Sequence, residues 1–172
     1  GTKLVSLGQT EWAAMRASYH VQARGLVDGG ADALLIETCQ DLLQLKCALD
    51  ACLGALREAG KTPEQVPVMV SVTIETTGAM LVGTAIEAVV RALRGYPVAT
   101  LGLNCATGPA EMAEHVTYLS KCWDRPITVM PNAGLPVLVE GKAAFPLTPA
   151  SMTETLMRYV ERLGVGAVGG CC

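Results

Sequence analysis

The sequence has 172 residues, of which 51% are hydrophobic and 17% are charged, which is typical of a folded globular domain and excludes a disordered chain. Its formal net charge is −3, from 13 basic and 16 acidic residues, so it lacks the basic surplus of a nucleic-acid-binding protein. No apolar run approaches the roughly 20 residues that cross a bilayer, and no secretory leader opens the chain, so we expect a cytoplasmic protein with no membrane partner.

The first half of the chain alternates between helical and strand patterns. Apolar residues at spacings of three and four predict a helix over 11–28, and the apolar run 33–36 predicts a strand. Asp41 with Gln44 three residues later resembles a capping box, which predicts that the next helix begins here. The unbroken β-branched run 68–74 predicts a second strand.

The second half continues the same alternation. Thr84 with Glu87 predicts a helix start, and Pro109 at a first helical position predicts another, whose helix runs to about Cys122. Thr148 and Pro149 open a last helix after a loop rich in Gly and Pro. The remaining predicted strands cover 98–103, 127–130 and 165–168.

The five predicted strands begin about 30 to 40 residues apart, each separated by one helix. This is the spacing of successive parallel βαβ units, so the fold class is α/β. The strand runs are apolar throughout, which predicts that both faces of the sheet are covered. An open doubly wound sheet and part of an eight-stranded barrel fit equally well on periodicity alone.

In either architecture ligands bind at the carboxyl ends of the strands, so the residues that follow each apolar run are candidates. Three of the seven cysteines fall at such ends. The candidates are Glu37, Ser71, Thr73, Asn104, Cys105, Asn132, Cys171 and Cys172.

The three strand-end cysteines suggest a catalytic zinc site. Zinc prefers four tetrahedral ligands, and three thiolates leave one position open for a substrate thiol. Other interpretations stay open: a lone strand-end Cys such as Cys105 is more often a buried small residue, and the pair Cys171-Cys172 suits a redox disulfide or part of a structural zinc site. Glu37 is equally well a solvated loop residue or a group that faces a ligand.

Three segments carry a strong resemblance to the homocysteine S-methyltransferase family. They are Gly-Gly-Ala-Asp-Ala-Leu-Leu-Ile-Glu-Thr (29–38), Gly-Leu-Asn-Cys-Ala (102–106) and Val-Gly-Gly-Cys-Cys (168–172). Two more segments, 107–109 and 130–136, resemble the cobalamin-dependent methionine synthase branch rather than the betaine or S-methylmethionine branches. The resemblance covers essentially the whole chain.

The family resemblance implies a (β/α)₈ TIM barrel, of which this chain covers roughly helix 3 to strand 8. Residues 1–172 are then a homocysteine-binding zinc domain that is incomplete at both ends, and we expect the chain to be unstable or inactive alone. The implied zinc ligands are Cys105, Cys171 and Cys172. Glu37 is implied to bind the substrate ammonium and Asn132 to lie beside the metal, while Ser71 and Thr73 are weaker candidates for contacting the substrate carboxylate.

The implied activity is zinc-dependent activation of the homocysteine thiol for methyl transfer from methylcobalamin, giving methionine. A free thiol has a pKa of about 8.5, and coordination to zinc deprotonates it. The resemblance further implies that a separate module holds methylcobalamin, and that folate, cobalamin and reactivation modules belong to the same longer polypeptide. The alternatives are a betaine- or S-methylmethionine-type methyltransferase, a metal-free redox barrel using Cys171-Cys172, or a structural zinc domain.

Overall fold

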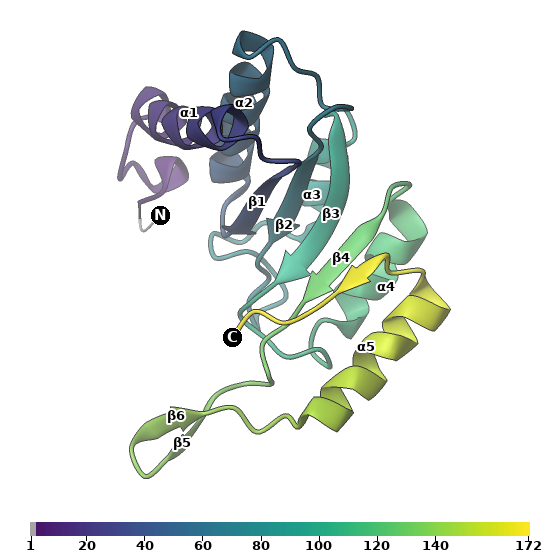
Figure 1. Cartoon of the computed structure of the whole chain (residues 1–172). Coiled ribbons are helices and arrows are strands. Elements are labelled where there is room, and N and C mark those ends of the chain that lie inside the picture. Colours follow the sequence, from purple (N-terminus) through teal and green to yellow (C-terminus); the bar gives the residue numbers. More distant parts are fainter. Residues whose placement is uncertain (1–2) are drawn as a thin grey trace.

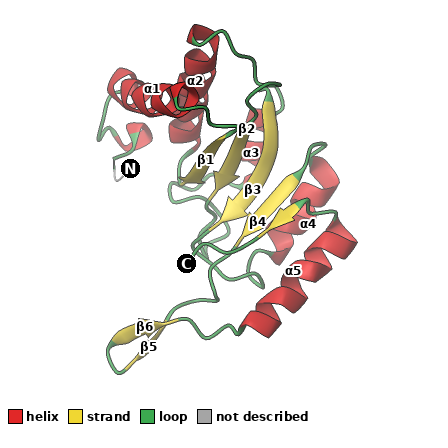
Figure 2. Cartoon of the chain, viewed as in Figure 1, coloured by secondary structure: helices red, strands yellow, loops and turns green. Residues whose placement is uncertain are grey.

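The computed structural model describes residues 3–172, which form one parallel sheet flanked by helices and a small separate hairpin (Figures 1 and 2). The helices are η1 (Val5–Leu7), α1 (Trp12–Asp28), α2 (Leu42–Glu58), α3 (Ile86–Leu93), α4 (Ala113–Cys122) and α5 (Pro149–Leu163). The strands are β1 (Leu34–Cys39), β2 (Val68–Val72), β3 (Val98–Asn104), β4 (Ile127–Met130), β5 (Val137–Val139), β6 (Lys142–Ala144) and β7 (Ala167–Val168).

The main sheet has the strand order β1-β2-β3-β4-β7, and every pairing is parallel. The strands therefore follow one another across the sheet in chain order. Right-handed crossovers that all step in the same direction place every connecting helix on the same face. Figure 1 shows the helices arrayed along one side of the curved sheet, which is the arrangement of a barrel segment and not of a doubly wound sheet.

The expectation that both sheet faces are covered is wrong for this chain. In β1, Leu34 and Ile36 are buried against the helices, whereas Leu35 and Glu37 on the opposite face are exposed. Only the helical face carries a continuous core, because the crossover geometry leaves the other face without a layer. That core joins β2 and β3 to the apolar stripe of α2, where Leu45 and Leu49 have no exposed surface.

Local signals explain where two helices begin. The carboxylate of Asp41 accepts a hydrogen bond from Gln44 N at 3.0 Å, which caps α2. The hydroxyl of Thr148 accepts one from Ser151 N at 3.2 Å, and Pro149 occupies the first turn of α5. Both predicted helix starts are confirmed.

Two other predicted helix starts are wrong. The N-cap of α3 is Ala85, which makes no side-chain cap, so Thr84 does not open this helix. The helix α4 begins at Ala113 rather than near Pro109. The carbonyl of Pro109 instead accepts a hydrogen bond from the Tyr159 hydroxyl of α5, a tertiary contact that takes precedence over the local helix-start signal.

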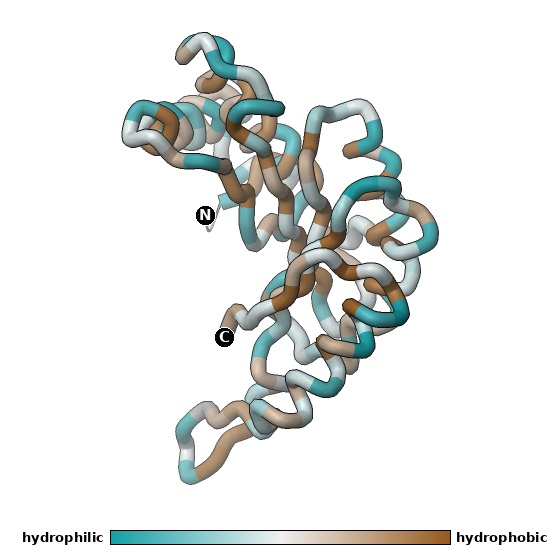
Figure 3. The backbone as a smooth tube through the Cα atoms, turned by 45° about the vertical axis from the view of Figure 1, so that its right-hand side comes forward, coloured by the Kyte–Doolittle hydropathy of each residue, from teal (hydrophilic) through white to brown (hydrophobic). Residues whose placement is uncertain are grey.

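The Gly/Pro-rich loop contains an antiparallel hairpin, β5-β6, that the sequence analysis does not predict. Its two-residue turn, Glu140-Gly141, has positive φ at both positions (50° and 77°), as a type I′ turn requires. The hairpin extends away from the rest of the molecule, and Figure 3 shows its hydrophobic strand next to a hydrophilic turn. Among the described residues, no helix is both long and apolar enough to cross a membrane.

Candidate metal and thiol site

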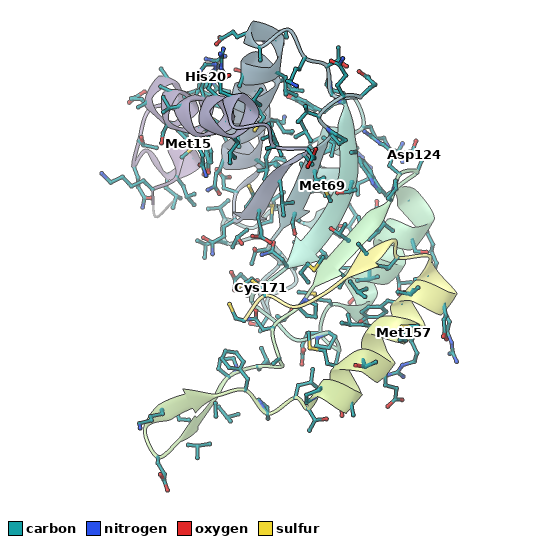
Figure 4. All side chains as sticks on the ribbon, in the orientation of Figure 1. Met15, His20, Met69, Asp124, Met157 and Cys171 are labelled. Carbon is teal, nitrogen blue, oxygen red and sulfur yellow. The ribbon has the colours of Figure 1, made fainter. Side chains whose placement is uncertain are left out.

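The strands of the main sheet all run in one direction, so their carboxyl ends lie side by side along one border of the sheet, called the carboxyl edge. The chain terminus lies at this edge, and Figure 4 shows the labelled Cys171 beside the ends of the strands. Cys105 follows β3, and Cys171 and Cys172 follow β7. These segments are more than 60 residues apart in sequence, and the sheet brings them together.

The three strand-end cysteines form one cluster. Cys105 Sγ lies 4.0 Å from Cys172 Sγ, and Cys171 Sγ lies 3.8 Å from Cys172 Sγ. All three sulfur atoms lie within 4.8 Å of one another, and no disulfide joins them. Cys171 and Cys172 are exposed, so the cluster opens to solvent.

Backbone hydrogen bonds fix the cysteine-bearing segments to the end of β4 and to the loop after it. Cys105 N donates to Met130 O at 3.2 Å, and Cys171 N donates to Pro131 O at 2.9 Å. Asn132 is buried, and its Oδ1 accepts a hydrogen bond from Cys172 N at 3.2 Å. Asn132 therefore lies at the cluster, where its side chain holds the backbone of Cys172.

Asn104 is a further residue of the site, to which the sequence analysis assigns no role. It has no exposed surface, and all four of its amide contacts are within the site. Its Oδ1 accepts hydrogen bonds from Thr38 N (3.1 Å) and Ser71 Oγ (2.7 Å). Its Nδ2 donates to Thr38 Oγ1 (2.7 Å) and to Cys171 Sγ (3.7 Å). The sequence shows only a polar residue at a strand end directly before Cys105, whereas its burial and its partners are visible only in the fold.

Glu37 and Thr38 form an irregularity in β1. The register with β2 shifts between Ile36 and Cys39, and Thr38 has a positive φ of 57°. Glu37 is exposed and lines a cavity of about 410 Å³ together with Thr38 and residues of α1 and α2. Glu37 thus lies at an exposed position directly before the bulge.

Ser71 and Thr73 are both buried, at 2% exposure each. Ser71 donates to Asn104, whereas the hydroxyl of Thr73 has no hydrogen-bond partner among the described residues. The structure therefore places Ser71 within the network behind the cluster. Thr73 has an unused donor near the same strand end.

Thiol ionisation differs between the cysteines. The pKa of Cys171 is raised to about 11, mainly because its sulfur is partly desolvated. The hydrogen bond from Asn104 lowers this pKa, and the neighbouring thiols of Cys172 and Cys105 raise it. None of these groups is cationic, so the cluster lacks a positive charge that would favour thiolates. Away from the cluster, burial raises the pKa of Cys39 to about 12 and that of Cys52 to about 11.

Two structures of one protein share the fold. The chain aligns with the homocysteine methyltransferase MmuM from Escherichia coli in its apo form (TM-score 0.72, 23% identity) and its metallated form (TM-score 0.70, 22% identity). Each alignment covers 95% of this chain, and 53% and 48% of the respective MmuM chains. The predicted fold, part of a TIM barrel, is confirmed.

Sequence comparison gives nearer relatives. The chain is 51% identical over all 172 residues to the methionine synthases of Mycobacterium leprae (strain TN) and Mycobacterium tuberculosis (strain ATCC 25618 / H37Rv). It spans only 14% of the length of either protein. A sequence model of the family described as homocysteine S-methyltransferase matches residues 2–172, and the chain therefore belongs to the homocysteine S-methyltransferase family.

Proposed function

We propose that this chain binds homocysteine and activates its thiol on a zinc ion for methyl transfer, as part of a methionine synthase. The observation that carries the proposal is the cluster of Cys105, Cys171 and Cys172 at the carboxyl edge of the sheet. Family membership supports the homocysteine substrate, and the metallated form of MmuM supports a metal in this fold.

The spacing of the cluster fits a tetrahedral zinc ion. With Zn–S bonds of about 2.3 Å, two thiolates on a tetrahedron lie about 3.8 Å apart. The two measured Sγ–Sγ distances are 3.8 and 4.0 Å. Three sulfur ligands would leave a fourth position, and the exposure of Cys171 and Cys172 supports access to it from solvent. Zinc, when bound, supplies the positive charge that keeps a substrate sulfur deprotonated and nucleophilic at neutral pH.

The chain's own residues bind and orient the amino acid. Glu37 is exposed at the same strand-end edge, and its carboxylate is suited to pair with the substrate ammonium. Thr73 has a free hydroxyl for the substrate carboxylate, whereas Ser71 is committed to Asn104 and acts through it. Asn132 accepts a hydrogen bond from Cys172 N, which supports a place for its side chain next to the open position of the metal.

For the methyl donor we propose methylcobalamin carried by a separate module, with folate, cobalamin and reactivation modules in the same longer polypeptide. The 51% identity to two methionine synthases supports this choice. The relatives' much greater length leaves room for such modules.

Zinc analysis and metal-edge X-ray absorption of the full-length protein, with and without homocysteine, test the proposal. We expect one metal per chain and three sulfur ligands, with a fourth sulfur replacing a lighter ligand when homocysteine is added. A metal-free protein with Cys171 and Cys172 oxidised would favour the redox interpretation. A metal site that ignores added thiols would favour a structural zinc domain.

A further inference from the structure

The buried amide of Asn104 connects two parts of the site that no other side chain joins within the described residues. One part is the bulge at Glu37-Thr38 in β1, and the other is Cys171 after β7. These segments lie on opposite edge strands of the sheet, and Asn104 ends the central strand β3 between them. Its position therefore allows it to act on both.

The hydrogen bonds fix which way the amide points. Thr38 N is a backbone donor, so the atom that receives it must be the oxygen of Asn104. The nitrogen is then directed to Thr38 Oγ1 and to Cys171 Sγ. The network thus presents an N–H donor to this sulfur whatever the protonation state of the thiol.

The same contacts support the bulge. A positive φ at a non-glycine residue such as Thr38 is costly and persists where its surroundings secure it. The Asn104 amide bonds both the backbone N and the side-chain oxygen of Thr38, and Ser71 holds the amide from β2. Glu37 directly precedes Thr38, so it lies next to the backbone that these contacts hold.

We propose that Asn104 is the positioning residue of the site. Its Nδ2 supports the Cys171 sulfur as a metal ligand, and its Oδ1 and Nδ2 together hold the bulge that presents Glu37 to the substrate. This inference rests on the proposed zinc and homocysteine function. Hydrogen bonds behind metal ligands orient them and tune their charge, and losing one typically weakens metal binding about 10- to 100-fold.

Asn104→Asp is the most informative variant because it keeps the shape. Its carboxylate still accepts from Thr38 N and Ser71 Oγ, but it turns an oxygen rather than an N–H towards Cys171. Asn104→Ala removes every contact and leaves buried donors unpaired, so its folding is checked separately. Thr100→Val is the matched control, because this hydroxyl is on the same strand and has no partner among the described residues.

In the full-length protein we expect Asn104→Asp to weaken zinc binding about 10- to 100-fold in chelator competition. With cobalt in place of zinc, we expect its sulfur-to-metal charge-transfer band to shift, and the homocysteine Kd to rise. Circular dichroism should match that of the wild type. Because a carboxylate at this buried position costs stability, thermal unfolding serves to confirm that the variant is folded at the assay temperature. Thr100→Val should leave the zinc affinity, the cobalt spectrum and the homocysteine Kd unchanged.

The inference is overturned if folded Asn104→Asp has the zinc affinity, cobalt spectrum and homocysteine Kd of the wild type. The role at the bulge is tested by folded Asn104→Ala, which also loses the contacts to Thr38. If this variant has an altered metal site but unchanged homocysteine binding, the role at the bulge is removed. If wild-type protein itself binds no metal or shows no response to homocysteine, the proposed function fails instead, so the two failures are distinguishable.

Discussion

At the residue scale, Cys105 provides the most direct test of the cluster. Replacing it with Ala leaves two thiols, and loss of one of three protein ligands should weaken zinc binding on the order of 100-fold or more. Cys122→Ala is the matched control, since this cysteine is half-buried at the end of α4 and outside the cluster. Chelator competition measures both variants, and equal zinc affinities would contradict the assignment of Cys105 as a ligand.

Glu37 tests the substrate end of the same site. Glu37→Gln removes the negative charge but keeps the size of the side chain. A charge-assisted hydrogen bond contributes about 1.5–3 kcal/mol, so we expect the KM for homocysteine to rise about 10- to 100-fold. Zinc content should stay at the wild-type level because Glu37 is not among the clustered ligands. Steady-state kinetics with metal analysis checks this, and an unchanged KM would show that Glu37 is a solvated residue.

Cys39 gives a prediction about thiol reactivity. It is 1% exposed, and burial raises its pKa to about 12 from an ordinary value of 9.0. Each pH unit below the pKa lowers the thiolate fraction about tenfold, so at pH 8 Cys39 has about 1,000-fold less thiolate than an unperturbed cysteine. We expect Cys39 to resist iodoacetamide in the folded protein and to react after denaturation, as read by mass spectrometry. Rapid labelling of the native protein would contradict the burial of this strand end.

At the element scale, the hydroxyl of Thr148 should stabilise the first turn of α5. Thr148→Ala removes the N-cap hydrogen bond and should lower the stability of the first turn of α5 by about 1 kcal/mol. This loss corresponds to about fivefold faster amide exchange in that turn. Thr155→Ala is the control, because this exposed hydroxyl donates to Ser151 O within the helix and caps nothing. Hydrogen-exchange mass spectrometry compares the two, and similar exchange in both variants would exclude a capping role.

Local patterns predict the strands and caps of this fold well, because they depend on residues close in sequence. The predicted strand 127–130 matches β4 (Ile127–Met130), and the Asp41 and Thr148 caps form as expected. Pro109 misleads because Tyr159, 50 residues away, binds its carbonyl. The hairpin is missed although Glu140-Gly141 between short apolar runs is a recognisable turn signal.

The site is predictable in part for the same reason. Strand-end position selects Cys105, Cys171 and Cys172, and the parallel sheet brings their sulfur atoms together. The role of Asn104 could not be predicted, because it depends on a bulge in β1 and on the direction of an amide across three strands. Gly102 is similar: only the fold shows that a Cβ there would lie 1.9 Å from Thr128 Oγ1.

At the scale of the whole molecule, the sheet formed by residues 3–172 has two unpaired edges, β1 and β7, and one uncovered face. Leu35 of β1 lies on the uncovered face and is 51% exposed. Leu26 of α1 lines the same cavity beside β1 and is 48% exposed. Unpaired strand edges beside exposed apolar side chains are templates for association with other chains. The matched MmuM chains are about twice as long, so their fold extends beyond the part that this chain covers.

We therefore expect the isolated 172-residue chain to self-associate and to bind a hydrophobic dye, whereas the full-length protein should do neither to the same degree. Light scattering after size-exclusion chromatography measures the first property and dye fluorescence the second. Leu35→Lys, which places a charge on the uncovered face, should reduce association of the isolated chain. Leu138→Lys is the control, because Leu138 is 81% exposed on the hairpin and away from the sheet edge. If the isolated chain is monomeric and binds no dye, the five strands form a self-sufficient unit. If Leu138→Lys reduces association as much as Leu35→Lys does, the contact lies on the hairpin instead.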